Sequence, residues 1–385
     1  MNKRKIAVFT SIRSEYGLLS PLLKRLKDST KFDLELLVGG AHLLEEFGMT
    51  INQIKEDGFK ITHIFDFVCR ENVSDSLTKS LSKLQETIGE YFVNNKPDLI
   101  IVLGDRFELL PIASACTVYN IPLAHISGGE ITQGAQDNQI RHALTKLAHI
   151  HFPANEEYKK NIMRMGEEDW RICVSGEPGL DLLKDINYIP KLELYKMLGL
   201  NAEQRLIICT FHPETISNKI TPEFVRMVLK KIVNTTNYQL LTTAANIDHG
   251  GVEINRLLEQ MAQDFSNIKY IRSLGQQKYY SVLKYADFML GNSSSGLVEA
   301  QSFNLPVINV GNRQEGRMTN PNVYQCSLEL DEILQGVKYV ITDDFKHKYF
   351  HKSNIYGDGN ACDKIMDYLE KVDFSKLIFK KTVFN

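Results

Sequence analysis

Polar segments stand directly after short apolar runs, and one of them has the composition of an anion site. Gly291–Gly296 reads Gly-Asn-Ser-Ser-Ser-Gly, follows the apolar run 287–290 and leads into a predicted helix over 296–303. Serine hydroxyls and the free backbone N–H groups of a helix start would bind a phosphate, with the helix dipole behind them. Glu299 comes one turn after Ser295, and a carboxylate there suits sugar hydroxyls. The alternative is an ordinary serine-rich helix cap.

A diphosphate also needs cations, and arginine binds phosphate oxygens with two parallel donors. Each arginine taken alone could instead be a solvated or salt-bridged surface residue. His212, between Phe211 and Pro213 at the end of an apolar run, could donate to an oxygen or relay a proton, or could be a satisfied loop histidine. The candidate cations are Arg13 and Arg106, which follow apolar runs, together with Arg313 and Arg317.

Three carboxylates in the first half of the chain could do acid and base chemistry. Asp105, Glu130 and Asp137 each fall on a different loop after a predicted strand, or on the helix that follows it. Carboxylates that converge raise one another's proton affinity, as burial does, so that one can serve as acid while another serves as base. Taken singly, each is more often a helix cap or a surface charge.

Other cofactor chemistry has weak support in the sequence. His142, His149 and His151 are close in sequence, but the His-Ile-His spacing suits a strand and no nearby Cys or carboxylate completes a ligand set. No G-x-G-x-x-G follows the first predicted strand, and no G-x-x-x-x-G-K-[ST] occurs. We therefore expect no metal, no dinucleotide fingerprint and no P-loop.

The overall composition excludes further classes. Lys+Arg number 45 and Asp+Glu 47, so the formal charge of −2 gives no field that would hold nucleic acid or an anionic membrane. The six cysteines form no C-x-x-C pair, which favours a reduced, cytoplasmic chain. No run approaches the ~20 apolar residues of a membrane span, and the first apolar stretch ends at Thr10, too early for a signal peptide.

A scaffold must bring these scattered segments together. In open α/β sheets ligands bind beyond the carboxyl ends of the strands, and here apolar runs alternate with amphipathic stretches, which predicts doubly wound parallel sheets. At ~150 residues per domain, 385 residues and a lapse of the strand pattern over 175–203 predict two α/β halves. The predicted strands are 6–9, 34–38, 99–103, 123–126, 150–153, 206–210, 239–243, 268–271, 287–290 and 306–310. The predicted helices are 17–27, 43–57, 74–94, 107–118, 138–148, 222–234, 251–264, 276–285, 296–303 and 360–371.

Eight segments in this order, spread over essentially the whole length, resemble one family. The chain is similar to the hydrolysing UDP-N-acetylglucosamine 2-epimerases, specifically their bacterial sialic-acid branch and the epimerase half of the bifunctional animal enzyme. Any one segment is a weak signal, but the ordered set is specific. The segments are Ser-Ile-Arg-Ser-Glu-Tyr-Gly (11–17), Gly-Asp-Arg (104–106), Gly-Gly-Glu (128–130), Ile-Arg-His-Ala-Leu-Thr-Lys-Leu-Ala-His (140–149), Phe-His-Pro-Glu-Thr (211–215), Gly-Asn-Ser-Ser-Ser-Gly (291–296), Gly-Asn-Arg-Gln-Glu-Gly-Arg (311–317) and Ile-Tyr-Gly-Asp-Gly-Asn-Ala (355–361).

The resemblance implies a glycosyltransferase-B-like fold of two Rossmann-like domains with the active site in the cleft between them, and a homodimer. It places the first domain at 1–175, joined by a returning C-terminal helix at 361–385, and the second at 176–360. Positions implied to transfer protons are Asp105 and Asp137, with Arg141 beside them, Glu130 nearby and His212 as a further candidate. Positions implied to bind UDP are Arg13, Gly17, Arg106, His212, Asn246, Ser293, Ser294, Ser295, Gly296, Glu299 and Arg313.

One position departs from the family pattern. The animal enzyme has a functional Glu two residues after the His of its His-Ile-x-Gly-Gly-Glu segment, and here that position is Ser127. Glu130 is the residue in the same loop that we expect to take over part of its role.

The implied reaction loses UDP from C1 and the proton from C2 to give a 2-acetamidoglucal, and then adds water to give ManNAc or a relative. C1–O cleavage must run ahead, because the C2 proton is weakly acidic, so stabilisation of the leaving diphosphate supplies the largest share of catalysis. The resemblance implies neither a redox cofactor nor a metal.

Three alternatives remain open from the sequence. The same reaction on UDP-N,N'-diacetylbacillosamine, feeding legionaminic acid, differs only in contacts around C4 and C6 of the sugar. A retaining glycosyltransferase shares the fold and the serine-rich loop but needs an acceptor. A nucleotide-sugar-binding regulator would not need the acidic residues for catalysis.

Overall fold

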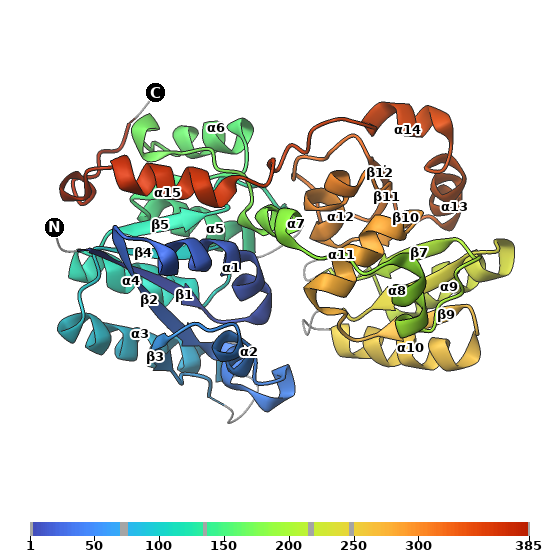
Figure 1. Cartoon of the computed structure of the whole chain (residues 1–385), viewed down its shortest axis with the longest axis horizontal. Helices are drawn as coiled ribbons and strands as arrows, with labels where there is room; N and C mark the ends of the chain where they lie inside the picture. Colours follow the sequence, from blue (N-terminus) through green and yellow to red (C-terminus); the bar gives the residue numbers. More distant parts are fainter. Residues whose placement is uncertain (1–2, 70–75, 134–136, 215–218, 246–249, 384–385) are drawn as a thin grey trace. The chain divides into compact units, whose positions relative to one another are not determined.

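In the computed structural model, which describes residues 3–69, 76–133, 137–214, 219–245 and 250–383, the strands form two six-stranded parallel sheets (Figure 1). Continuous apolar runs such as Leu99–Leu103 form the buried central strands, as expected where helices cover both faces of a sheet. The first sheet consists of β1 (Arg4–Thr10), β2 (Phe32–Gly39), β3 (Ile61–Phe65), β4 (Leu99–Leu103), β5 (Leu123–Ile126) and β6 (Ile150–Phe152). The second consists of β7 (Leu206–Thr210), β8 (Gln239–Thr243), β9 (Ile268–Ile271), β10 (Phe288–Gly291), β11 (Val307–Val310) and β12 (Val323–Cys326).

The helices connect these strands and cover them. Those of the first half of the chain are α1 (Arg13–Asp28), α2 (Ile51–Glu56), α3 (Ser76–Asn94), α4 (Leu109–Tyr119), α5 (Asp137–Leu147), α6 (Glu156–Arg164) and α7 (Leu182–Asp185). Those that follow are α8 (Lys191–Leu198), α9 (Pro222–Thr235), α10 (Gly251–Asp264), α11 (Gly275–Tyr285), α12 (Ser294–Val298), α13 (Leu330–Tyr339), α14 (Asp343–Tyr349) and α15 (Ala361–Lys371). No helix in the described ranges has both the length and the apolar character that crossing a bilayer requires.

Contacts along the chain divide it into two units. Unit 1 consists of Met1–Glu130, Asp137–Lys184 and Tyr356–Asn385, and unit 2 of Ile131–Gln136 and Asp185–Ile355. The change from one unit to the other after Lys184 falls later than the expected boundary at 175/176, and the return at Tyr356 falls earlier than 360/361. The last segment of the chain therefore belongs to the same unit as the first strand.

Both units repeat one topology. The strand order is β3-β2-β1-β4-β5-β6 in unit 1, and β9-β8-β7-β10-β11-β12 in unit 2 when its sheet is read from the β9 edge. In such sheets the strand order reverses at one point, and ligands bind beside it at the carboxyl ends of the strands. The reversal lies between β1 and β4 in unit 1, and between β7 and β10 in unit 2.

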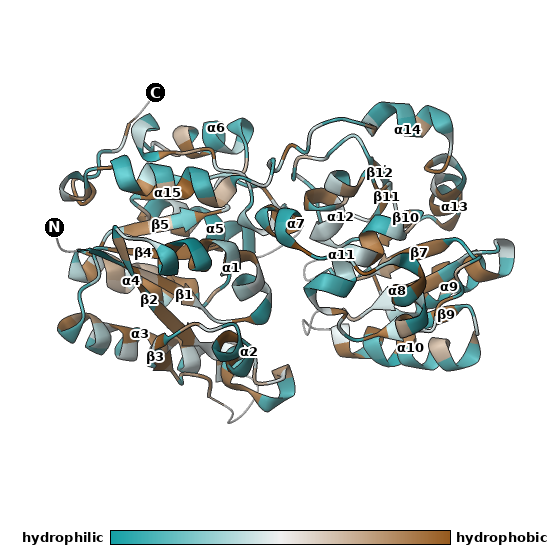
Figure 2. Ribbon diagram, in the orientation of Figure 1, coloured by the Kyte–Doolittle hydropathy of each residue, from teal (hydrophilic) through white to brown (hydrophobic). Residues whose placement is uncertain are grey.

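Apolar packing explains why each sheet is covered on both faces. In unit 1 one core packs α1, α2 and α15 against the sheet, and a second core packs α3, α4 and α5 against the other face. In unit 2 the large core lies under α9, α10, α13 and α14, while α11 and α12 contact the sheet at β7 and β11. Figure 2 shows the same pattern, with hydrophobic residues concentrated in the strands and hydrophilic residues on the outer helices.

Several local predictions were wrong. The helix expected over 43–57 is a pair of 3₁₀ turns, Gly40–Leu43 and Glu45–Phe47, followed by the short α2. The edge strands β3 and β12 were not predicted, because Ile-Thr-His-Ile-Phe and Val-Tyr-Gln-Cys are half-exposed and polar, without the apolar run of a central strand. The helix expected over 296–303 is α12 followed by a 3₁₀ turn at Ala300–Phe303.

Candidate functional site

The loops after β1 and β4 meet at the strand-order reversal of unit 1. Glu15, in the first turn of α1, accepts hydrogen bonds at Oε2 from the Ser11 backbone N–H (2.9 Å) and the Ser11 hydroxyl (3.1 Å). Burial raises the pKa of Glu15 to about 7, against the lowering effects of the Ser11 N–H and the Arg106 charge. Arg106 pairs with Glu108 through two bonds of 2.8 and 3.0 Å. Arg13, the first residue of α1, is exposed.

A buried guanidinium joins two of the expected acid/base positions. Arg141, on α5, is 1% exposed; it forms an ion pair with the Asp105 carboxylate and donates to the Glu130 carbonyl oxygen at 3.1 Å. Asp137 begins the same helix one turn earlier, where it is exposed. Residues four apart share a helix face, so α5 presents Asp137 and Arg141 on one side.

His125 is hydrogen-bonded to the loop that carries Asp105. Its Nε2 donates to the Gly104 carbonyl oxygen (2.7 Å), and Nδ1 lies 3.2 Å from Thr145 Oγ1. Burial lowers the pKa of His125 to about 4, so the ring is neutral near pH 7. A buried neutral histidine that bonds the Asp105 loop is a structural element of the site.

Ser127, at the position of the family Glu, contacts a carboxylate from elsewhere in unit 1. Its hydroxyl donates to Glu177 Oε2 at 2.8 Å, and both residues are buried. Glu177 was not among the predicted site residues, because its segment was read as inter-domain connection. The available signal was an acidic residue in a Gly-Glu-Pro-Gly turn at 176–179, following an apolar stretch.

In unit 2 the loops after β7 and β10 are joined by a reciprocal pair of hydrogen bonds. The His212 N–H donates to Asn292 Oδ1 (2.7 Å), and Asn292 Nδ2 donates to the His212 carbonyl oxygen (2.8 Å). Arg313 Nη1 also donates to the Asn292 carbonyl oxygen, at 3.2 Å. Burial, and then the Arg313 charge, lower the pKa of His212 to about 3. The imidazole is therefore neutral and can donate a hydrogen bond, but it is not a cationic acid near pH 7.

The serine-rich turn is organised by its own side chains. Ser293 caps α12 by accepting the Ser295 N–H (3.4 Å), and the Tyr279 hydroxyl donates to Ser295 Oγ (2.5 Å). Glu299 interacts with Ser295 and Tyr280, and burial raises its pKa. Because α12 ends after five residues, serine hydroxyls and Arg313 carry more of the anion-binding potential than a helix dipole does.

The remaining predicted residues have simple placements. Ser294 is the first residue of α12, and a Cβ on Gly296 would lie 2.8 Å from Val307, so glycine allows close packing onto β11. Gly17 lies inside α1, where its carbonyl accepts the Ser20 hydroxyl. Arg317 Nη1 donates to Gln314 (3.2 Å). Asn246 lies outside the described residues.

Comparison with known proteins identifies the family. Residues 24–370 match the family model described as UDP-N-acetylglucosamine 2-epimerase. The chain belongs to this epimerase family. It is 37% identical to the hydrolysing GDP/UDP-N,N'-diacetylbacillosamine 2-epimerase of Campylobacter jejuni, with 90% of each chain covered. It is 35% identical to the hydrolysing UDP-N,N'-diacetylbacillosamine 2-epimerase of Legionella pneumophila, with 98% of each covered.

Solved structures of epimerases share the fold. The UDP-GlcNAc 2-epimerase of Neisseria meningitidis bound to UDP-GlcNAc superposes with a TM-score of 0.80 at 16% identity, over 96% of this chain and 100% of that one. The prediction of a glycosyltransferase-B-like fold with two doubly wound α/β halves is confirmed.

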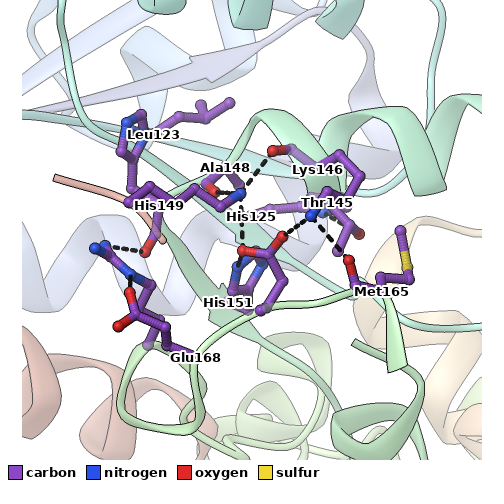
Figure 3. Close-up of polar contacts among 12 residues, drawn as sticks. Leu123, His125, Thr145, Lys146, Ala148, His149, His151, Met165 and Glu168 are labelled. Atoms are coloured by element: carbon purple, nitrogen blue, oxygen red, sulfur yellow. Dashed lines mark hydrogen bonds and ion pairs between the residues drawn. The ribbon is translucent and has the colours of Figure 1, made fainter. Parts of the chain in front are cut away.

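Two of the three histidines considered as metal ligands, His149 and His151, have other partners. His149 Nδ1 accepts the Leu123 N–H (3.1 Å), and both residues are labelled in Figure 3. His151 Nε2 lies 3.2 Å from Glu167. Glu167 also pairs with Lys146 (2.6 Å) and Lys380 (2.7 Å). Within the described ranges, no group of three or more His, Cys, Asp or Glu side chains is arranged to hold a metal ion.

Proposed function

We propose that the protein is a hydrolysing UDP-sugar 2-epimerase whose substrate is UDP-N,N'-diacetylbacillosamine. The observation that carries this proposal is the 37% and 35% identity, over 90% and 98% of the chain, to two hydrolysing epimerases whose names include that sugar nucleotide, the first together with its GDP form. The product would be UDP and the free 2-epimer of the sugar.

The chemistry begins with departure of UDP from C1. In this proposal Arg313, the hydroxyls of Ser293 and Ser294, and the neutral His212 ring donate to the leaving diphosphate, while Glu299 binds ribose. In support of this, Arg313 and His212 are both hydrogen-bonded to Asn292, which directly precedes Ser293. Donors that are fixed before the reaction stabilise the developing charge without reorganisation, which is the largest expected contribution to rate.

Acid and base groups come from unit 1. Asp105 takes the C2 proton as its carboxylate, and Asp137 is the second proton-transfer group of the elimination site. The ion pair with Arg141 orients the Asp105 carboxylate, which a base in direct contact with substrate requires. In this proposal Arg106 also serves the phosphates, with its charge partly offset by the bidentate pairing with Glu108.

The test is product analysis in D2O. The protein is incubated with UDP-N,N'-diacetylbacillosamine and, separately, with UDP-GlcNAc, without any acceptor, and products are followed by NMR. We expect UDP and a free sugar, epimerised and deuterated at C2, from the first nucleotide. Absence of UDP release from both nucleotides would overturn the proposed activity, and release only with an added acceptor would indicate a glycosyltransferase.

UDP-GlcNAc is the second candidate substrate, because the matching family model carries its name. Faster turnover of UDP-GlcNAc in the same assay would replace the first proposal with this one, and the product would then be ManNAc. The discriminating contacts surround C4 and C6 of the sugar.

We also propose that the protein works as a homodimer in the cytoplasm. All six cysteines are free, in keeping with a reducing compartment. Light scattering of the purified protein should give twice the mass of one 43.9 kDa chain, and a monomer mass would contradict the dimer.

A further inference from the structure

The Ser127–Glu177 pair lies at the carboxyl end of the unit 1 sheet and has no part in the proposed elimination. Ser127 directly follows β5, and its N–H donates to the Phe152 carbonyl oxygen at the end of β6. The neighbouring Glu130 carbonyl accepts from Arg141, which also holds Asp105. The pair therefore belongs to the loop cluster that carries the candidate base.

The geometry of Ser127 fixes the direction of the hydrogen bond that its hydroxyl donates. The residue has a φ of +62°, a left-handed conformation that is unfavourable for a non-glycine residue. In that conformation its hydroxyl donates to Glu177 Oε2 at 2.8 Å. Because the proton points at the carboxylate, the lone pairs of the serine oxygen can only accept.

Glu177, the partner of Ser127, is held in place by contacts with a distant segment of the chain. The Glu177 N–H donates to the Tyr356 carbonyl oxygen at 2.8 Å. On either side of this bond Gly176 and Gly357, with φ of +90° and +137°, pack so closely that a Cβ on one would lie 3.2 or 3.1 Å from the Cα of the other. The Tyr356 hydroxyl lies 3.1 Å from that of Tyr158. Glu177 is thus held by a segment that returns from the far end of the chain.

We propose that Ser127 and Glu177 form a proton-accepting relay that activates the water added in the second half of the reaction; this inference rests on the proposed function. Water gives a proton to Ser127 Oγ as the serine proton passes to Glu177 Oε2. The resulting hydroxide forms the bond to C1 of the 2-acetamidoglucal, while C2 receives a proton from the elimination site. Glu177 ends the step protonated and returns its proton to solvent, so the charges balance. Ser127 meets the water, and Glu177 is a positioning residue that acts through it.

The relay suits water better than the C2 proton. Proton transfer through a hydroxyl needs a hydrogen-bonded donor, which water supplies and a C–H bond does not. Abstraction from carbon needs a base in direct contact, and Asp105 is the candidate for that role. The relay is therefore assigned to hydration alone, which makes its loss distinguishable from loss of the elimination base.

The test is the product ratio of Glu177→Gln, a variant that keeps a hydrogen-bond acceptor for Ser127. We expect free-sugar formation to fall by about a hundredfold or more while UDP release stays within about threefold of wild type, so that the glycal accumulates. Ser127→Ala should give the same partition. Glu35→Gln is the matched control, because Glu35 is a buried carboxylate of unit 1 that also accepts from a hydroxyl, that of Tyr91 at 3.1 Å. It should leave the product ratio unchanged.

Two outcomes overturn the relay. A folded Glu177→Gln protein that forms sugar and glycal in the wild-type ratio would show that the carboxylate only supports the loop. A folded variant that loses UDP release together with sugar formation would assign the pair to elimination. If the wild-type protein releases UDP from neither nucleotide, the proposed function fails first, so the two failures are separable.

Discussion

Arg141 is a buried cation, and Asp105 compensates its charge. Asp105→Asn would remove the carboxylate that forms an ion pair with the buried guanidinium, so we expect a loss of about 3 kcal/mol in the free energy of unfolding, together with at least a roughly hundredfold fall in UDP release. Asp137→Asn, at an exposed position, should lower UDP release with a stability change within about 0.5 kcal/mol. Urea denaturation and a UDP-release assay check both. Wild-type release rates in both variants would show that neither carboxylate is needed for the elimination.

Glu15 should make stability depend on pH in an unusual direction. Its pKa is raised from 4.5 to about 7, so the folded state binds the proton more tightly than the unfolded state does. This stabilisation is full below pH 4.5 and is lost as the pH rises through 7, amounting to about 3 kcal/mol.

Glu15→Gln removes that dependence. We therefore expect the variant to gain stability relative to wild type between pH 5 and pH 8, as measured by urea denaturation at the two values. Equal differences at both pH values would contradict the raised pKa.

At the scale of single elements, glycine at the end of β10 is a steric requirement. A Cβ on Gly291 would lie 1.9 Å from the Thr210 carbonyl oxygen, and its φ is +136°. Gly291→Ala should therefore push β10 from β7 and cost about 3 kcal/mol or more. Gly48, whose φ is +84° with no atom within 4 Å of its would-be Cβ, is the control and should cost only about 1 kcal/mol. Thermal unfolding compares the stability of the two variants. Equal losses of stability would show that the close approach of Gly291 to Thr210 does not matter.

The elements that the sequence predicted well were those decided locally. Continuous runs such as Leu99–Leu103 and 123–126 predict buried strands, because no other short element buries every side chain. β3 and β12 escaped because their polar, half-exposed sequences contain no apolar run, whereas the opposite edge strands, β6 and β9, were predicted. Glu177 escaped for a different reason: it meets Ser127 across fifty positions of sequence, a proximity that only the fold creates. His212 was predicted as a site residue, but its neutrality depends on burial.

At the scale of the whole molecule, the C-terminal segment completes unit 1. α15 buries Cys362, Ile365 and Leu369 against the core that contains α1. Beyond it, Arg171 donates to the carbonyl oxygens of Leu377 (3.0 Å) and Phe379 (2.8 Å).

Truncation after Lys371 would remove two carbonyl oxygens that accept hydrogen bonds from the buried Arg171. It would also remove Lys380, an ion-pair partner of Glu167. We expect the free energy of unfolding of unit 1 to fall by several kcal/mol, while the unfolding transition of unit 2 is unchanged. Calorimetry can resolve the two transitions. A single unshifted transition would contradict this.

The same returning segment sets an order for synthesis. The strands of unit 2 leave the ribosome before residues 356–385, which unit 1 needs to cover one face of its sheet. Unit 2 can therefore fold while unit 1 still lacks its C-terminal segment. The unit with the candidate acid/base groups is then the last to be completed. Chains truncated after residue 355 and released from the ribosome should be cut by protease in unit 1 before unit 2, and the reverse order would contradict this.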